Sequence, residues 1–320
     1  MFGHGAPAVL SVIPDTFTFA WIVAILFATA WLFDERGLAA GRALAAGTWA
    51  LFGLFWLSTV PYFAFEHQSY VESILALVGF PASVYAGYLL YDGRASLFTL
   101  TRAIAIMLFI YLPFETIPAF TVGGVAVPEP RRILIEVVAT QTGALIDLLG
   151  YAPEAVTSRE GYEAAYSWTL DDGHTVIIHI VLACTGLGSM AIFGGLVAAV
   201  EAPLARKLRA LAVSIPLIYV LNIFRTTFIS VVSGNQYMHW YPDLVMTMFG
   251  ATDPYRVSFL ISDRIMSQLL AVVALIAITF LAVRELPELA VILEDVLYLI
   301  TGEEHDLTEA LDLPREPTNR

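Results

Sequence analysis

Three residues combine a nucleophile with two cations inside segments that are otherwise apolar. The only cysteine, Cys184, lies in HTVIIHIVLACTGLGSMAIFGGLVAAV (residues 174–200), which contains no Asp, Glu, Lys or Arg. Arg225 lies in LIYVLNIFRTTFISVV and Arg264 in VSFLISDRIMSQLLAVVALIAITFLAV. A lone cysteine in such a segment more often packs as a small hydrophobic residue. We predict a reactive thiol only because we expect both arginines to lie beside it.

An arginine near the centre of a membrane-spanning helix needs an explanation, since it costs about 2.5–3.5 kcal/mol on insertion scales. Snorkelling of the long side chain to the headgroups is one explanation. Polar neighbours at helical spacing favour a cavity instead, with Asn222 at i−3 from Arg225. Ser267 and Gln268 lie at i+3 and i+4 from Arg264.

The chemistry that this combination allows is nucleophilic attack on a carbonyl. A cation about 4 Å from a thiol, at an effective dielectric of about 20, stabilises the thiolate by roughly 4 kcal/mol, or about three pKa units. The developing oxyanion also needs donors, and a fixed guanidinium supplies them. We therefore predict Cys184 as the nucleophile, with Arg225 and Arg264 stabilising the thiolate and the oxyanion.

The general acid or base is not identified by spacing. His174, His179 and His239 are candidates to protonate a leaving amine, and each is more often a satisfied interfacial side chain. One cysteine excludes an intramolecular disulfide and a multi-cysteine metal site. We expect neither a metal nor a cofactor.

The composition predicts an all-α polytopic membrane protein. Apolar residues make up 58% of the 320 residues and charged residues 14%, and the mean hydropathy is +0.74. The net charge of −13 argues against nucleic acid as a partner. One of the 16 basic residues is a lysine, Lys207; with the acidic surface this indicates a high-salt organism or, equally, a GC-rich genome.

About seven apolar runs are predicted to cross the membrane as helices. They are residues 17–33, 44–65, 74–91, 103–120, 174–200, about 208–232 and about 257–283. In a helix over 174–200, Cys184, Gly188, Ala191 and Gly195 form a stripe of small residues that permits close helix packing. Residues 131–150 are expected to form an interfacial helix; their insertion would give eight spans.

The loop charges predict the orientation. Short loops rich in arginine fall on one side when the N-terminus is outside and the C-terminus is cytoplasmic. All three site residues then lie in the outer half of the membrane, with Cys184 about 15 Å deep at the helical rise. We predict a transmembrane domain over 1–284, with 121–173 as an extracytoplasmic loop or lid. An acidic cytoplasmic tail, with 10 acidic and 2 basic residues, follows over 285–320.

Three stretches resemble a known family. ACTGLGSMAIF around Cys184, LNIFRTTFIS around Arg225 and SDRIMSQ around Arg264 are similar, in this order, to the motifs of the archaeosortase/exosortase family. The resemblance covers the C-terminal half, while the first 120 residues match only as generic hydrophobic spans. Many relatives have histidine at the third position, and Arg264 places this chain with the arginine type.

The resemblance implies an integral-membrane cysteine transpeptidase of archaea. Its substrates would be secreted surface proteins, typically the S-layer glycoprotein, whose C-terminal sorting signal is a Pro-Gly-Phe motif, a transmembrane helix and a basic end. Cleavage in the family is coupled to attachment of a membrane lipid. Carried over here, Cys184 is the nucleophile, and Arg225 and Arg264 are its catalytic partners.

Two other functions fit parts of the pattern. A transporter or channel would use the paired arginines to bind an anionic solute, although no inverted repeat supports it. A structural or assembly protein would only pair the arginines with acids such as Asp263.

Overall fold

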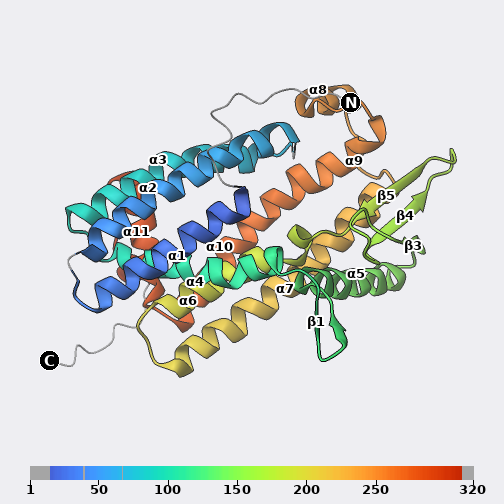
Figure 1. Cartoon of the computed structure of the whole chain (residues 1–320). Helices are drawn as coiled ribbons and strands as arrows, with labels where there is room; N and C mark the ends of the chain where they lie inside the picture. The colour runs from blue at the N-terminus through green and yellow to red at the C-terminus, as the bar shows by residue number, and fades with distance from the viewer. Residues whose placement is uncertain (1–14, 39, 67, 312–320) are drawn as a thin grey trace, which may run out of the picture. The chain divides into compact units, whose positions relative to one another are not determined.

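The computed structural model describes residues 15–38, 40–66 and 68–311 (Figure 1). The chain divides into two compact units, each built from separate stretches of sequence. Unit 1 comprises residues 1–116, 194–203 and 287–320, and unit 2 comprises residues 117–193 and 204–286.

Unit 1 is a bundle of long apolar helices. Its helices are α1 (Thr16–Glu35), α2 (Ala40–Pro61) with a π-helical end at Tyr62–Glu66, α3 (Tyr70–Asp92), α4 (Leu97–Thr116), α11 (Leu289–Thr301) and α12 (Leu307–Ala310). Phe27 packs edge-on against Trp49 and Phe52. A Cβ on Gly53 would lie 2.9 Å from a backbone oxygen of α3, so this glycine allows α2 and α3 to pack closely.

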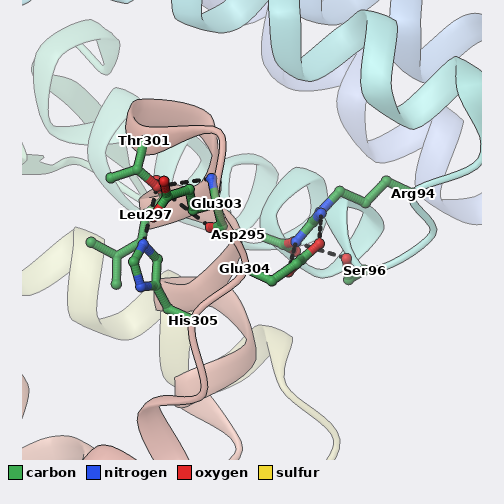
Figure 2. A network of polar contacts seen from close by, with 8 residues as sticks. All are labelled: Arg94, Ser96, Asp295, Leu297, Thr301, Glu303, Glu304 and His305. Atoms are coloured by element: carbon green, nitrogen blue, oxygen red, sulfur yellow. Dashed lines mark hydrogen bonds and ion pairs between the residues drawn. The ribbon is translucent and has the colours of Figure 1, made fainter.

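The C-terminal helix α11 is attached to the turn between α3 and α4 by ionic contacts, as Figure 2 shows. Arg94 Nε lies 2.6 Å from Asp295 Oδ1, and Arg94 Nη1 lies 2.7 Å from Glu304 Oε1. Ser96 Oγ donates to the same Asp295 oxygen at 2.9 Å. The guanidinium of Arg94 also lies over the ring of Tyr298. The acidic C-terminal segment is therefore partly integrated into unit 1 and is not wholly solvated.

Unit 2 combines a small antiparallel sheet with long helices. It begins with the hairpin β1 (Phe120–Val122) and β2 (Val125–Val127), helix α5 (Pro130–Leu148), and strands β3 (Glu154–Val156), β4 (Ala165–Thr169) and β5 (Thr175–His179) in the order β3-β4-β5. Trp168 on β4 lies against Gly234, where no Cβ would fit. Gly234 is the last residue of α7, so this contact fixes the sheet on the end of that helix.

The remaining elements of unit 2 carry the site. They are the 3-10 turn η3 (Leu182–Thr185), α6 (Leu187–Ala199), α7 (Leu204–Gly234), α8 (Pro242–Phe249), the turn η4 (Pro254–Arg256), α9 (Val257–Phe259), the π-helical segment η5 (Leu260–Ser267) and α10 (Gln268–Glu285). Helix α6 passes into unit 1 at Gly194. Helix α7 packs against α5, η3 and α10, and Figure 1 shows α7 and α10 side by side.

The prediction of a helical membrane protein is confirmed in that the fold is mostly helical, but it is not all-α, since unit 2 contains five strands in two small sheets. In the described chain six helices are long and apolar enough to cross a membrane: residues 16–35, 40–66, 70–92, 97–116, 204–234 and 254–285. The count of about seven spans and the orientation of the termini stay predictions. The helix predicted over 131–150 is present as α5, and its placement at the membrane interface stays a prediction. The strands on either side of it were not anticipated.

The prediction of one helix over residues 174–200 is wrong. This stretch forms strand β5, the turn η3 and the 13-residue helix α6. Its first part, Thr-Val-Ile-Ile, is β-branched throughout and pairs with β4. Cys184 is therefore outside the helix, and the predicted stripe of small residues is reduced to Gly188, Ala191 and Gly195 on α6. Gly195 has the expected role in close packing, since a Cβ there would lie 2.5 Å from the backbone oxygen of Ala103 in unit 1.

Candidate active site

Cys184 lies in a tight turn that its neighbours define. Its backbone N–H donates to Val181 O at 2.8 Å. Gly186 follows in the left-handed region at φ +75, which a side chain would strain, and a Cβ there would lie 3.2 Å from Asn222. Thr185 Oγ1 accepts from the backbone N–H of Leu187 at 3.3 Å, at the start of α6. The Cys-Thr-Gly sequence thus ends the strand layer and begins a helix within three residues.

Helix α7 holds this turn by the backbone carbonyl of Cys184. Asn222 Nδ2 donates a hydrogen bond to Cys184 O. Thr226 Oγ1 lies 3.2 Å from the same oxygen and 2.9 Å from Asn222 O, so these two acceptors compete for one hydroxyl proton. Asn222, Arg225 and Thr226 are spaced i, i+3 and i+4, which places them on one face of α7. Arg225 therefore shares the face that holds the cysteine turn.

Both arginines meet on one carboxylate that sequence reasoning treated only as a structural partner. Arg225 Nη2 lies 2.8 Å from Asp263 Oδ1, and Arg264 Nη1 lies 3.4 Å from Asp263 Oδ2. Asp263 is 7% exposed. Asp263 and Arg264 lie in the π-helical segment η5, and such segments inside helices are frequently found at functional sites.

The charges of this cluster reach Cys184, which lies outside the six long helices. Burial raises the pKa of the Cys184 thiol above its ordinary value. A hydrogen bond from the backbone and the charges of Arg225 and Arg264 lower this pKa, and the charge of Asp263 raises it. The net direction is upward, so the thiol at rest is neutral. The depressed pKa that the arginines alone would produce is therefore not present, and attack requires loss of the thiol proton to a base.

An apolar pocket of about 570 Å³ adjoins the cysteine turn. Its polar lining consists of Ser189, Asn222, Arg225 and Ser267, and most of the remaining lining comes from apolar residues of α7 and α10. The Nε atom of Arg225 and the Oγ atom of Ser267 are buried without a hydrogen-bond partner in the described chain. The pocket therefore combines a few polar side chains with a mostly apolar surface.

The three candidate histidines lie in different places. His174, in the turn between β4 and β5, stacks on the ring of Tyr255 with 3.6 Å between ring centroids. Asp172 Oδ2 accepts from Tyr255 Oη at 2.6 Å, so this turn is fastened to η4. His239 lies between α7 and α8.

His179 ends the strand that leads into the cysteine turn. Its Nδ1 is buried, and no hydrogen-bond partner for it occurs among the described residues. Burial, then the charge of Arg159, lowers the pKa of His179 below its ordinary value. The imidazole is thus neutral and able to accept a proton.

One sequence-based inference about the site loses its basis. The depth of about 15 Å for Cys184 assumed a helical rise, which a strand and a turn do not have, so that value no longer follows. Placement in the outer half of the membrane stays a prediction that rests on Arg225 and Arg264. No group of three or more His, Cys, Asp or Glu side chains in residues 15–38, 40–66 and 68–311 could hold a metal ion.

Comparison with known proteins decides the family. A family model described as transmembrane exosortase (Exosortase_EpsH) matches residues 14–254. Archaeosortase A of Haloferax volcanii is 52% identical over 294 residues, which cover 92% of this chain and 97% of that protein. Archaeosortase A of Natronomonas pharaonis is 43% identical over 309 residues, which cover 92% of each chain. The chain belongs to the archaeosortase/exosortase family.

Membership of this family confirms the resemblance drawn from the three motifs, and both curated relatives carry the name archaeosortase A. The chain is a multi-pass membrane protein and a sortase-like processing enzyme of the peptidase or transpeptidase class. Both relatives come from haloarchaea, in agreement with the high-salt, archaeal origin that the composition and motifs indicated. No solved structure matches the chain.

Proposed function

We propose that this archaeosortase/exosortase family member is a cysteine transpeptidase with Cys184 as nucleophile and Arg225 and Arg264 as its catalytic partners. Its substrates would be secreted surface proteins, the S-layer glycoprotein among them, with a C-terminal Pro-Gly-Phe motif and transmembrane helix. A membrane lipid would accept the cleaved chain. One observation carries the proposal: the face of α7 that holds the Cys184 carbonyl also presents Arg225, which pairs with Asp263 next to Arg264.

The reaction follows from these positions in two transfers. A neutral base such as His179 takes the thiol proton, and the Cys184 sulfur forms a bond to the substrate carbonyl carbon. The carbonyl oxygen becomes an oxyanion beside the guanidiniums, which stabilise it without reorganising. The carbon–nitrogen bond then breaks, the leaving amine takes the proton from the base, and a thioester remains. A hydroxyl or similar nucleophile on the lipid attacks the thioester and restores the thiol.

The apolar pocket supports a substrate that arrives within the membrane. Its walls on α7 and α10 suit a hydrophobic helix or lipid chain, while Arg225 and Asn222 bring polar contacts to one reacting group. A soluble peptidase would not need such a surface to reach a peptide bond in water. The pocket therefore favours a client with a transmembrane helix next to the cleavage point.

Mass spectrometry of client C-termini tests the proposal. Cells would carry wild type, Cys184→Ala or Cys184→Ser as the sole copy, at matched membrane levels of the enzyme. We expect clients to lose the C-terminal helix and gain the mass of a lipid only with the wild-type chain. Normal processing by Cys184→Ala would overturn the proposal. Uptake of an anionic solute that fails in arginine variants, but not in cysteine variants, would point to a transporter instead.

A further inference from the structure

We propose that Asp263 is the positioning residue that holds Arg225 and Arg264 together beside the Cys184 turn. The inference rests on the proposed function, because the arginines need a fixed geometry only if they act on the reaction at Cys184. Nothing in the sequence motif, in which Asp263 merely precedes Arg264, specifies this role.

The carboxylate of Asp263 contacts one arginine from each of two elements. Arg225 comes from α7 and binds Oδ1 at 2.8 Å, whereas Arg264 comes from η5 and lies 3.4 Å from Oδ2. The two oxygens of a carboxylate are rigidly linked, so each guanidinium is placed relative to the other. Without Asp263 the two cations would repel each other across a low-dielectric site.

The backbone around Asp263 is itself held in place. Ser262 Oγ lies 3.0 Å from Ser233 Oγ on α7, and both side chains are fully buried. Ser258 Oγ donates to Val232 O of α7 at 2.9 Å. The chain that leads into Asp263 is therefore fastened to α7 at two points, Ser258 in α9 and Ser262 directly before Asp263. A positioning residue needs this kind of support, because movement of its own side chain would also move the residues that it orients.

Asp263 also sets the charge that acts on the thiol. The three side chains carry a net charge of +1, and the negative charge of Asp263 opposes the effect of both guanidiniums on Cys184. A neutral residue at position 263 would leave a net charge of +2 beside the turn. Substitution therefore has an electrostatic signature at Cys184 that simple loss of packing would not produce.

The experiment compares Asp263→Asn with a matched control, Asp295→Asn, which makes the same change at a buried aspartate of unit 1. Alkylation of the purified full-length chain reports one site, because Cys184 is the only cysteine. We expect Asp263→Asn to shift the pH midpoint of alkylation down by about one unit and to reduce kcat/KM for a client peptide by about tenfold or more. Asp295→Asn should leave both quantities at the wild-type value.

The outcomes separate the two proposals. If Asp263→Asn matches Asp295→Asn in alkylation and in processing, the role of Asp263 is overturned. If Cys184→Ala also processes clients normally, the proposed function itself has failed.

If Asp263→Asn does not yield folded protein in the membrane, a second variant, Asp263→Glu, tests the same proposal. It preserves the charge and displaces the carboxylate by one carbon–carbon bond, so processing should fall while the alkylation midpoint stays unchanged. Processing by Asp263→Glu at the wild-type rate would overturn the positioning role.

Discussion

Each unit contains a buried aspartate that pairs with arginine, but the ratio of arginines to carboxylates differs between the two clusters. Asp295 in unit 1 binds Arg94, whose guanidinium is also bound by Glu304. Asp263 in unit 2 contacts two guanidiniums, those of Arg225 and Arg264. The first group of three side chains therefore carries a net charge of −1, and the second a net charge of +1.

The difference separates a structural cluster from one suited to chemistry. The nitrogens of Arg94 are directed to Asp295 and Glu304 (Figure 2). Its guanidinium also lies over the ring of Tyr298, so the side chain serves to attach α11. In unit 2 a positive charge remains beside a thiol and an apolar pocket, and Arg225 Nε has no hydrogen-bond partner in the described chain. Excess positive charge at a partly buried site is costly for folding, and under the proposed function it stabilises the anion that forms during the reaction.

The largest effect is expected from replacing one arginine in each cluster. Arg225→Gln removes a cation from the forming oxyanion, so client processing should fall by about 10²–10³-fold at matched membrane levels. Arg94→Gln should lower the thermal stability of the purified chain and leave kcat/KM per folded molecule unchanged. If both variants lose activity only in proportion to folded protein, the contrast between the clusters does not hold.

A smaller effect is expected when the cysteine turn is loosened without a change of charge. Asn222→Ala removes the amide that donates to the Cys184 carbonyl. The Thr226 hydroxyl replaces it only in part, because its single proton is shared between Cys184 O and Asn222 O. We expect kcat/KM to fall by about tenfold, since a lost buried hydrogen bond costs about 1–2 kcal/mol. The pH midpoint of Cys184 alkylation should remain at the wild-type value. A shift of that midpoint would mean that Asn222 acts on the charge of the thiol and not on its position.

The helices of this fold are largely predictable from sequence, because an apolar run bounded by charges specifies both length and type. The first run, predicted over 17–33, is helix Thr16–Glu35, and the last, predicted over about 257–283, lies within residues 254–285. The helix prediction for residues 174–200 failed because a continuous apolar run is compatible with either a strand or a helix. The β-branched start of this run favours a strand, and the pairing of β5 with the preceding strand β4, for example Ile178 with Tyr166, makes it one.

The candidate site was predictable as a set of residue types but not as a geometry. Cys184, Arg225 and Arg264 stand out because a thiol and charges are rare in apolar segments. The spacing of Asn222 and Arg225 predicted a shared face, which the structure has on α7. The pairing of Asp263 with Arg225 joins residues 38 positions apart, and no local pattern encodes it. The upward direction of the Cys184 pKa likewise depends on burial, which requires the folded chain.

The smallest effect is expected in unit 1, at the cluster of Arg94, Asp295 and Glu304. Hydrogen bonds from Arg94 lower the pKa of Glu304 below its ordinary value of 4.5. A carboxyl group with a lower pKa in the folded state stabilises the fold fully above pH 4.5, and this contribution is lost as the pH falls through the lower folded value. Acidification should therefore loosen the attachment of α11, whereas mild alkaline pH should not.

Hydrogen exchange of the α11 amides, corrected for the intrinsic effect of pH, measures this loosening. Wild-type protection should decline toward that of Glu304→Gln as the pH falls below 4.5, so that the difference between the two chains closes in this range. Because Glu304 is exposed and Asp295 retains its contact with Arg94, the change should stay local to the C-terminal segment and leave processing at neutral pH unaltered. Equal protection of the two chains at pH 6 would mean that Glu304 does not hold α11, and that Asp295 alone makes the attachment.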